Sequence, residues 1–357
     1  MIMTLKNTLI SFYKKHKKTI FLVLRIVIGL TLIGVLIGTQ LRDFGNALEI
    51  LKSSHIGFLI LAFSTHFAGL WITAERWRIL LKAQGVRLGV GTLSITVLIS
   101  FLYSNVLPTT IGGDVYRIYD SAKKGDMPAE KAASVVLVER FSGVVSGASY
   151  AVIALFLGFT AIGEQSVIIP IVIFFTFSLV IGFLIINPSI LKLDRLVARI
   201  SFLNKIRKRL KNIYNTLRSF KQAKLSLFLA LILSFAMQFM IILEYYLAAK
   251  ALDIDLGLVA FVFISPVVAI ITMLPISIGG LGLRENALVF ILVAMGVANE
   301  RAAVFSLLIL VMFLALGILG GLANIIRPFF ERKEIAAKEK RGAGKENGEI
   351  GPSGTGR

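Results

Sequence analysis

The sequence contains no cysteine, and its only three histidines are His16, His55 and His66. The absence of cysteine excludes disulfide bonds and thiolate metal sites. The histidines are scattered, and no group of His, Asp and Glu has the spacing of metal ligands, so we expect no metal and no other cofactor. His66 lies inside an apolar segment, where a packed side chain that faces neighbouring helices is more typical than a ligand.

Acidic residues are also scarce, since 20 Asp and Glu oppose 39 Lys and Arg and leave a formal net charge of +19. The excess lies in three stretches. Residues 1–18 carry five Lys and no acid, residues 188–224 carry eleven bases and one Asp, and residues 327–357 carry eight bases and five Glu. Basic stretches beside membrane spans set the orientation of a membrane protein and attract anionic lipid. Their location favours a membrane protein and argues against nucleic-acid binding.

Long apolar runs are abundant in this chain, which is 56% hydrophobic with a mean hydropathy of +0.83. Soluble domains are about 45–50% apolar. A helix needs about 20 apolar residues to cross a bilayer, and six segments qualify: 19–39, 56–74, 131–160, 166–186, 225–249 and 301–326. These runs lack the two-residue alternation of an outer-membrane barrel. We therefore predict an all-α polytopic membrane protein.

The first apolar run follows a basic N-terminus, as it would in a signal peptide. Its length of about 20 residues exceeds that of a signal-peptide core, and no small-x-small cleavage site follows it. We therefore predict that residues 19–39 are an uncleaved first span and that the membrane domain covers residues 19–326. The positive-inside rule places both termini in the cytoplasm of a plasma-membrane protein. Residues 327–357 are predicted to be a cytoplasmic tail, disordered because it is polar and Gly-rich.

Two related motifs interrupt further apolar runs, LPTTIGGDVYR at 107–117 and LPISIGGLGLR at 274–284. If residues 89–127 crossed the membrane once, the basic stretch 188–224 would lie outside, against the positive-inside rule. An even number of crossings is required, and a re-entrant hairpin is the simplest solution. The same logic makes residues 257–298 a second hairpin. The prediction is about six full spans plus two re-entrant helical hairpins.

The two motifs belong to an internal repeat. They share Leu, Pro, Ile, Gly, Gly and Arg at identical spacing, and matches on both sides keep a nearly constant offset. The predicted repeats are 56–160 and 225–326, each a span, a hairpin and a span. Three crossings separate their starts, so the two units are inverted relative to each other. Inverted repeats with broken helices are typical of transporters that bind substrate near the bilayer midplane.

Each motif combines features of an anion site. A glycine pair permits a sharp turn, after which a restarting helix presents free N–H groups. An arginine follows about one turn later and can donate two hydrogen bonds to a phosphate. The obvious anion inside a membrane is a lipid phosphate. The candidate residues are Gly112, Gly113 and Arg117 in the first motif, Gly279, Gly280 and Arg284 in the second, and Asn105, which could donate to the headgroup or cap the broken helix.

Each motif arginine has an acid beside it. Asp114 precedes Arg117 by three residues, one turn of helix, and Glu285 directly follows Arg284. Each arginine could therefore bind substrate, or its neighbour could neutralise it and hold the hairpin closed. The two roles are compatible if substrate competes with the acid for the arginine.

Two more charges, Glu139 and Arg140, lie deep in the third apolar run, where ionisable groups are costly and by default functional. Neighbours on a helix point about 100° apart and cannot both face one partner. Glu139 could carry a coupling proton and Arg140 could meet substrate or Asp114; an interhelical salt bridge is the alternative. Glu75 and Glu244 lie nearer the membrane interface, and we expect structural roles for both.

The basic stretch 188–224 has apolar residues at roughly helical spacing among its charges. This pattern predicts an amphipathic helix on the cytoplasmic leaflet, in contact with anionic lipid. An anchor for topology is the favoured interpretation over substrate recruitment.

The motif LPTTIGGDVYR with Asn105 before it, VVLVERFSG, and LPISIGGLGLRE together resemble the lysylphosphatidylglycerol synthase transmembrane family of flippase-like membrane proteins. The resemblance covers nearly the whole chain up to about residue 326. Family members fused to a cytosolic aminoacyltransferase domain make an aminoacylated phospholipid and move it across the bilayer. This sequence carries no such domain, so the resemblance implies lipid translocation without aminoacylation.

The leading hypothesis is therefore a flippase or transporter that binds an anionic lipid headgroup between the hairpins, and not an enzyme. The sequence has no P-loop motif, so transport would be downhill or coupled to protons or membrane potential. One alternative is an intramembrane transferase that acts on a polyprenyl-phosphate-type lipid, which the few, arginine-flanked carboxylates disfavour. Another is a scaffold for a separate lipid synthetase. A scaffold needs no buried charges, so the charges within the apolar runs argue against it. The headgroup, the direction and the oligomeric state stay open.

Overall fold

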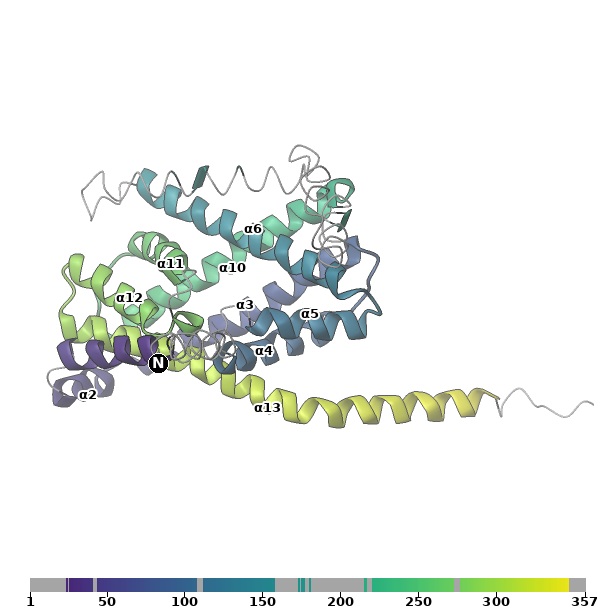
Figure 1. Ribbon diagram of the computed structural model, residues 1–357. Coiled ribbons are helices and arrows are strands. Elements are labelled where there is room, and N and C mark those ends of the chain that lie inside the picture. Colours follow the sequence, from purple (N-terminus) through teal and green to yellow (C-terminus); the bar gives the residue numbers. More distant parts are fainter. Residues whose placement is uncertain are drawn as a thin grey trace, which may run out of the picture.

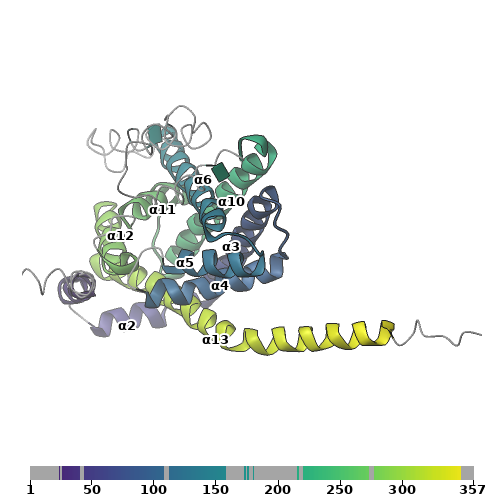
Figure 2. The same cartoon turned by 45° about the vertical axis from the view of Figure 1, so that its right-hand side comes forward.

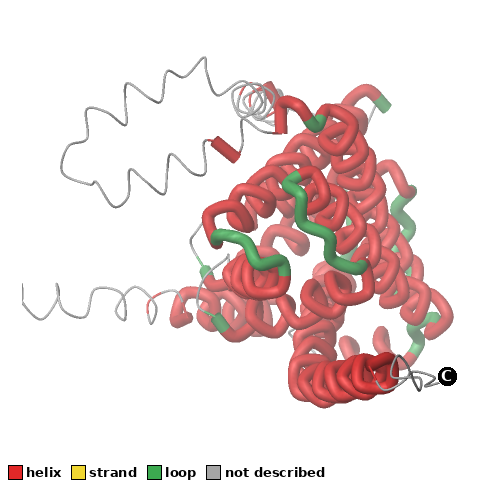
Figure 3. The backbone as a smooth tube through the Cα atoms, turned by 90° about the vertical axis from the view of Figure 1, so that its right-hand side faces the viewer, coloured by secondary structure: helices red, strands yellow, loops and turns green. Residues whose placement is uncertain are grey.

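The computed structural model describes residues 24, 26–40, 44–107, 112–157, 220–272 and 277–346, with isolated positions between 173 and 216. The regular structure in these residues is entirely helical (Figure 3). The predictions for residues 1–18, for the span 166–186 and for most of the basic stretch 188–224 fall outside the described residues.

Within the described residues, four helices are long and apolar enough to cross a membrane: α3 (Ile56–Ala83), α6 (Ala129–Phe156), α10 (Lys224–Ala251) and residues Asn299–Phe329 of α13. A fifth candidate is formed by residues Ile26–Gln40 together with α2 (Phe44–Lys52), which is bent by 92° at the break. These helices correspond to five of the six predicted apolar segments. The protein is thus an all-helical, multi-pass membrane protein.

Two pairs of shorter helices lie between the long ones. Helices α4 (Val90–Val106) and α5 (Gly112–Lys124) pack against each other, and so do α11 (Leu258–Thr272) and α12 (Leu283–Ala294). The apolar members α4 and α11 have 17 and 15 residues, fewer than the roughly 20 that a full crossing needs. Both breaks coincide with the Leu-Pro and Gly-Gly motifs, although residues 108–111 and 273–276 lie outside the described part.

The ends of the helices recur along the chain. Helix α3 is followed by a left-handed residue, Gly85 (φ 79°), and α10 by Asp253 (φ 52°), 168 positions later. Helices α5 and α12 are followed in the same way by Asp126 (φ 46°) and Gly296 (φ 86°), 170 positions apart. After each of the four, the next residue donates its N–H to the carbonyl five positions earlier. This bond belongs to a Schellman helix end, so the two halves of the chain share local structure as well as motifs.

The equivalent helices α3 and α10 pack along each other and run antiparallel. His66 contacts Glu244, whereas Arg76, ten positions further along α3, contacts Ser234, ten positions earlier on α10. Each half also packs on the other, with α4 against α13 (Asn299–Glu346) and α11 against α6. Figure 1 shows α3 and α10 in the middle of the resulting bundle.

Close backbone contact joins α4 to α13. A Cβ atom on Gly320 would lie 2.3 Å from the carbonyl oxygen of Leu98, and one on Gly317 would lie 2.0 Å from Nδ2 of Asn105. That amide nitrogen donates to the carbonyl of Phe313 at 3.5 Å. Glycines on α13 therefore allow α4 of the first helix pair to pack closely against the last long helix.

The second tip packs against two other parts of the chain. A Cβ on Gly279 would lie 3.6 Å from the carbonyl oxygen of Ser104, at the end of α4. Gly282, with φ of 76°, would meet the carbonyl oxygen of Gly29 at 2.6 Å if it carried a Cβ. The second tip thus lies between the end of α4 and the first described helix.

Helix α13 continues as a helix to Glu346 and projects from the bundle (Figures 1 and 2). It therefore extends into the range 327–357, of which residues 347–357 are outside the described part. Where it leaves the bundle, Arg327 donates to Asp120 Oδ2 and to the hydroxyl of Tyr116, both at 2.9 Å. These contacts hold the exit of α13 against α5.

Candidate functional site

A cavity of about 710 Å³ lies between the two halves of the bundle. Helices from both halves line it, and most of its wall is apolar. Its charged lining residues come from five helices: Arg76 from α3, Asp114 and Arg117 from α5, Glu139 and Arg140 from α6, Glu244 from α10 and Arg284 from α12.

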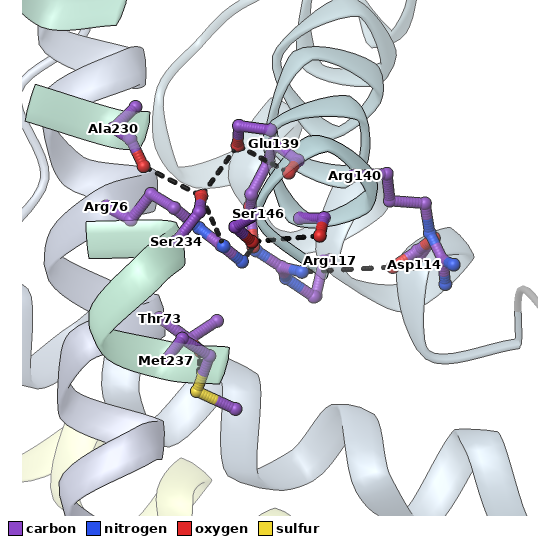
Figure 4. Close-up of polar contacts among 12 residues, drawn as sticks. Thr73, Arg76, Asp114, Arg117, Glu139, Arg140, Ser146, Ala230, Ser234 and Met237 are labelled. Carbon is purple, nitrogen blue, oxygen red and sulfur yellow. Dashed lines mark hydrogen bonds and ion pairs between the residues drawn. The ribbon is translucent and has the colours of Figure 1, made fainter. Parts of the chain in front are cut away.

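Five of these side chains form a line of ion pairs, the charge chain, in the order Arg76, Glu139, Arg117, Asp114 and Arg140 (Figure 4). Arg76 Nη2 donates to Glu139 Oε1 at 2.7 Å, and Arg117 Nη2 donates to Oε2 of the same carboxylate. Arg117 Nη1 also lies 3.8 Å from Asp114 Oδ1, and Arg140 Nε donates to Asp114 Oδ2. The signs alternate, so three guanidinium groups face two carboxylates and one positive charge is in excess.

The charge chain is buried along most of its length and open at one end. Glu139 is 2% exposed and Arg117 is 7% exposed, whereas the side chain of Arg140 is 48% exposed. An ion is costly to bury without a partner, and each buried member here has one. Arg140 is therefore the guanidinium of the chain that an incoming anion can reach.

Neighbouring side chains hold the buried guanidinium groups in place. Arg76 Nη1 donates to the Ser234 hydroxyl at 2.9 Å, and that hydroxyl is 2.8 Å from the hydroxyl of Ser142. The guanidinium of Arg117 lies 4.4 Å from the centroid of the Trp77 ring, a cation–π contact. These contacts leave little freedom at the Arg76 end of the charge chain.

The glycine pair of the first motif positions α5. A Cβ on Gly112 would lie 2.6 Å from the carbonyl oxygen of Tyr103, and one on Gly113 would lie 2.6 Å from the carbonyl oxygen of Ser100. Only residues without a side chain allow α5 to begin directly against α4. That start places Asp114 within the first turn of α5, where it meets α6.

The second motif contains its own counterion. Arg284 Nε and Nη2 donate to Glu285 Oε1 at 2.9 and 2.7 Å, and Glu285 Oε2 accepts the N–H of Gly282 at 2.6 Å. Glu285 is fully buried, and the Arg284 guanidinium lies 4.9 Å from the Phe313 ring centroid. The carboxylate of Glu285 thus occupies the N-terminal end of α12. The glycines before it, Gly279 and Gly280, adopt φ of 59° and 78°.

A further pair joins α3 to α10 in the cavity wall. His66 Nδ1 lies 3.1 Å from Glu244 Oε2, and the two side chains are 11% and 8% exposed. His66 faces the neighbouring helices, as the sequence indicates. The sequence predicts a structural role for Glu244, and in the structure its side chain also lines the cavity.

The sequence-predicted site residues fall into three groups. Those that line the cavity are Asp114, Arg117, Glu139, Arg140 and Arg284. Those that shape the hairpins or pair behind the wall are Gly112, Gly113, Gly279, Gly280 and Glu285. Asn105 instead contacts α13 and does not belong to the cavity lining. Within the described residues, no group of three or more His, Asp and Glu side chains is placed to hold a metal ion.

Arg76 is not among the sequence-predicted site residues, because the charges of residues 74–82, AERWRILLK, suggest a membrane boundary. The missed signal is helical spacing. Small and weakly polar residues at Thr65, Gly69 and Thr73 recur every three or four positions, and Arg76 continues that stripe. The stripe is the buried face of α3. Arg78 lies off it, with its side chain 42% exposed.

Comparison with known proteins agrees with the helical architecture. Residues 22–321 match the family described as "Lysylphosphatidylglycerol synthase TM region". A UPF0104 membrane protein of Methanocaldococcus jannaschii is 23% identical over 330 residues, which cover 88% of this chain and 96% of the relative. Another UPF0104 membrane protein of that organism is 29% identical over 215 residues, which cover 58% of this chain and 86% of the relative. The matched range includes both helix pairs and every charged residue of the cavity.

Proposed function

Since the chain belongs to the lysylphosphatidylglycerol synthase transmembrane family, we propose that it is a lipid flippase. In this proposal it moves a lipid with a phosphate-bearing, anionic headgroup from one leaflet to the other through the cavity between its halves. The protein acts as a transporter and not as an enzyme.

The observation that carries the proposal is the half-exposed guanidinium of Arg140, which lies at the open end of the charge chain in the cavity. Ionisable groups at membrane depth are costly and mark substrate paths. A guanidinium that is half exposed, beside an acid that accepts from it, can exchange that acid for a phosphate oxygen. Asp114 can then turn to Arg117, whose Nη1 is already only 3.8 Å away.

The apolar part of the cavity wall suits the rest of a lipid. Side chains from α3, α4 and α13, such as Leu70, Phe101 and Ile309, line the cavity beside the charges. A lipid has the same division, with a charged headgroup and apolar chains. A small hydrophilic substrate would not benefit from such a wall.

The membrane arrangement in this proposal has two inverted units. Helices α3 and α10 are antiparallel, as equivalent first helices of inverted units must be, and the short helices α4 and α11 support re-entrant hairpins. About six full spans place both termini in the cytoplasm of the plasma membrane, in agreement with the positive-inside rule. The basic stretch 188–224 then faces anionic lipid of the inner leaflet.

A reconstitution assay tests the proposal. Purified protein is placed in phosphatidylcholine vesicles that contain a trace of acyl-labelled phosphatidylglycerol, and dithionite bleaches the label in the outer leaflet. We expect the wild type to move the label and Arg140→Ala to move it about tenfold more slowly, since one charge-assisted hydrogen bond contributes about 1.5–3 kcal/mol.

Arg78→Ala is the matched control, because Arg78 also carries an ion pair but lies outside the cavity lining. It should move lipid at the wild-type rate. Equal rates for Arg140→Ala and the wild type, with both proteins folded, would show that Arg140 does not meet the headgroup. A wild type that leaves the label in place would contradict the flippase itself.

A further inference from the structure

The proposed headgroup contact does not use His66 and Glu244, although both line the cavity. They form a largely buried pair of an imidazole and a carboxylate across the interface of α3 and α10, with 3.1 Å between Nδ1 and Oε2. Glu139, the acid that the sequence suggested as a proton carrier, is unsuited to that role because two guanidinium groups hold it. A mobile proton in the cavity therefore has a better position at His66 and Glu244.

The described charges in and directly behind the cavity wall cancel when His66 is neutral. Four guanidinium groups then face four carboxylates: Arg76, Arg117, Arg140 and Arg284 against Asp114, Glu139, Glu244 and Glu285. One proton bound by the His66 and Glu244 pair changes this balance to one positive charge. A phosphodiester headgroup carries one negative charge, so its binding returns the net charge of the cavity to zero.

We propose that the His66 and Glu244 pair binds a proton that crosses the membrane together with an anionic phosphodiester headgroup. This inference rests on the proposed flippase function. A net charge is costly inside a bilayer, so the loaded cavity with proton and phosphodiester is neutral, and so is the empty cavity. Either ligand alone leaves a charge without a partner. The coupling is one proton for each headgroup, and the movement of both is electrically neutral.

The arginine that α12 brings to the cavity wall, Arg284, is already neutralised by Glu285.

Among the described residues, the charged side chains that the other helices bring to the cavity have partners of their own. On α3 and α6, Arg76 and Glu139 hold each other and Arg140 pairs with Asp114. Helix α11 has no ionisable side chain, and α13 lines the cavity with apolar residues. Whether the pair holds a proton therefore depends on His66 and Glu244 themselves.

The internal repeat places a different pair of side chains at the equivalent contact. The positions equivalent to His66 and Glu244, 168 residues away, are Ser234 and Arg76, which contact each other through Arg76 Nη1 and the Ser234 hydroxyl. At this equivalent contact the charge is permanent, because it is the guanidinium of Arg76. At the related place the chain instead carries an imidazole and a carboxylate.

The test adds a pH difference to the vesicle assay. With one proton per headgroup, each unit of pH difference should change the leaflet ratio of labelled phosphatidylglycerol by up to about tenfold. The wild type should show that change, and a potassium diffusion potential set with valinomycin should have no effect. Glu244→Gln should lose the response to the pH difference.

The control is Asp253→Asn. Asp253 accepts from His55 at the same 3.1 Å, but that pair is more than half exposed, and Asn tolerates the left-handed backbone at this position. It should respond to the pH difference like the wild type. A wild type without a response, or Glu244→Gln with the wild-type response, overturns the inference.

A second measurement separates this inference from the flippase proposal. Dihexanoyl phosphatidylglycerol is added to the protein in weakly buffered detergent, and a pH-sensitive dye reports proton uptake. We expect about one proton per protein molecule, lost in His66→Gln and Glu244→Gln and absent with dihexanoyl phosphatidylcholine. Uptake by a protein that moves no lipid supports the proton site and contradicts the flippase. The absence of uptake overturns the inference.

Discussion

Glu139 is the residue on which the charge chain depends, because its two oxygens hold Arg76 and Arg117 in a buried environment. In Glu139→Gln, one guanidinium keeps an oxygen acceptor and the other faces an NH₂ group. Removing one partner from a buried ion pair costs about 3–5 kcal/mol. We therefore expect a large fall in the midpoint of thermal unfolding, measured in detergent by intrinsic fluorescence.

The control for this prediction is Glu75→Gln. Glu75 also forms an ion pair, but the side chain of its partner Arg78 is 42% exposed. Such pairs contribute about 0–1 kcal/mol, so its midpoint should stay close to that of the wild type. If the two variants unfold at the same temperature, Glu139 does not hold the buried arginines as the structure indicates.

The charged residues of the cavity could be predicted from the sequence more readily than their partners. Asp114, Arg117, Glu139 and Arg140 stand out as charges within or beside apolar runs. Helical spacing pairs Asp114 with Arg117, and the sequence also offers Arg140 as a partner of Asp114; in the structure Arg140, on another helix, is the closer of the two. That pairing depends on how α5 and α6 are rotated against each other, which local sequence does not determine.

At the scale of the element, the close backbone approach of α4 to α13 depends on Gly320. A Cβ on Gly320 would lie 2.3 Å from a backbone carbonyl oxygen, that of Leu98. A backbone carbonyl cannot relieve the clash by changing rotamer, as a side chain can. Gly320→Ala must therefore push the two helices apart. Overpacking of this kind costs about 1–3 kcal/mol, and we expect a lower midpoint of thermal unfolding.

The next residue of α13 provides the matched control. A Cβ on Gly321 would lie 3.6 Å from the nearest atom, a methyl carbon of Leu102, which is ordinary contact. Alanine favours a helix by up to about 1 kcal/mol over glycine, so Gly321→Ala should be neutral or slightly stabilising. A destabilisation as large as that of Gly320→Ala would mean that α4 and α13 are not packed as closely as described.

Helix breaks could be predicted from the sequence, but helix ends in charged segments could not. The Pro and Gly residues of the two motifs indicate both breaks, because Pro lacks an N–H group and Gly allows left-handed backbone. The span predicted at 56–74, in contrast, is part of a helix that continues to Ala83. Hydropathy ends the span at Glu75 and Arg76, but ion pairs satisfy both charges. The 92° bend after residue 40 has no comparable signal.

At the scale of the whole molecule, the internal repeat accounts for the position of the cavity. Equivalent helices α3 and α10 are antiparallel, and each short helix pair packs on the last long helix of the other half. The cavity is therefore formed by the two halves together. Motif spacing predicts the two units, whereas the pairing between them needs the tertiary structure.

The orientation of the two units gives a sharp prediction for the chain in its membrane. Arg87 and Asp255 occupy equivalent places, 168 positions apart, in the connections that follow α3 and α10, and both are exposed in the structure. Inverted units put these two positions on opposite sides of the membrane, whereas units in the same orientation put them on one side. Since the chain has no cysteine, Arg87→Cys and Asp255→Cys each introduce a single reactive thiol.

We expect a membrane-impermeant maleimide to label Asp255→Cys on intact cells and to label Arg87→Cys only after the cells are permeabilised. A third variant, Lys123→Cys at the end of α5, examines the hairpin itself. A re-entrant pair of α4 and α5 returns the chain to the side from which it entered, so Lys123→Cys should behave like Arg87→Cys. Labelling of Arg87→Cys and Asp255→Cys from one side would contradict the inverted units. Labelling of Lys123→Cys from the side opposite to Arg87→Cys would instead show that the first helix pair crosses the bilayer, and the basic residues 188–224 would then lie outside the cytoplasm.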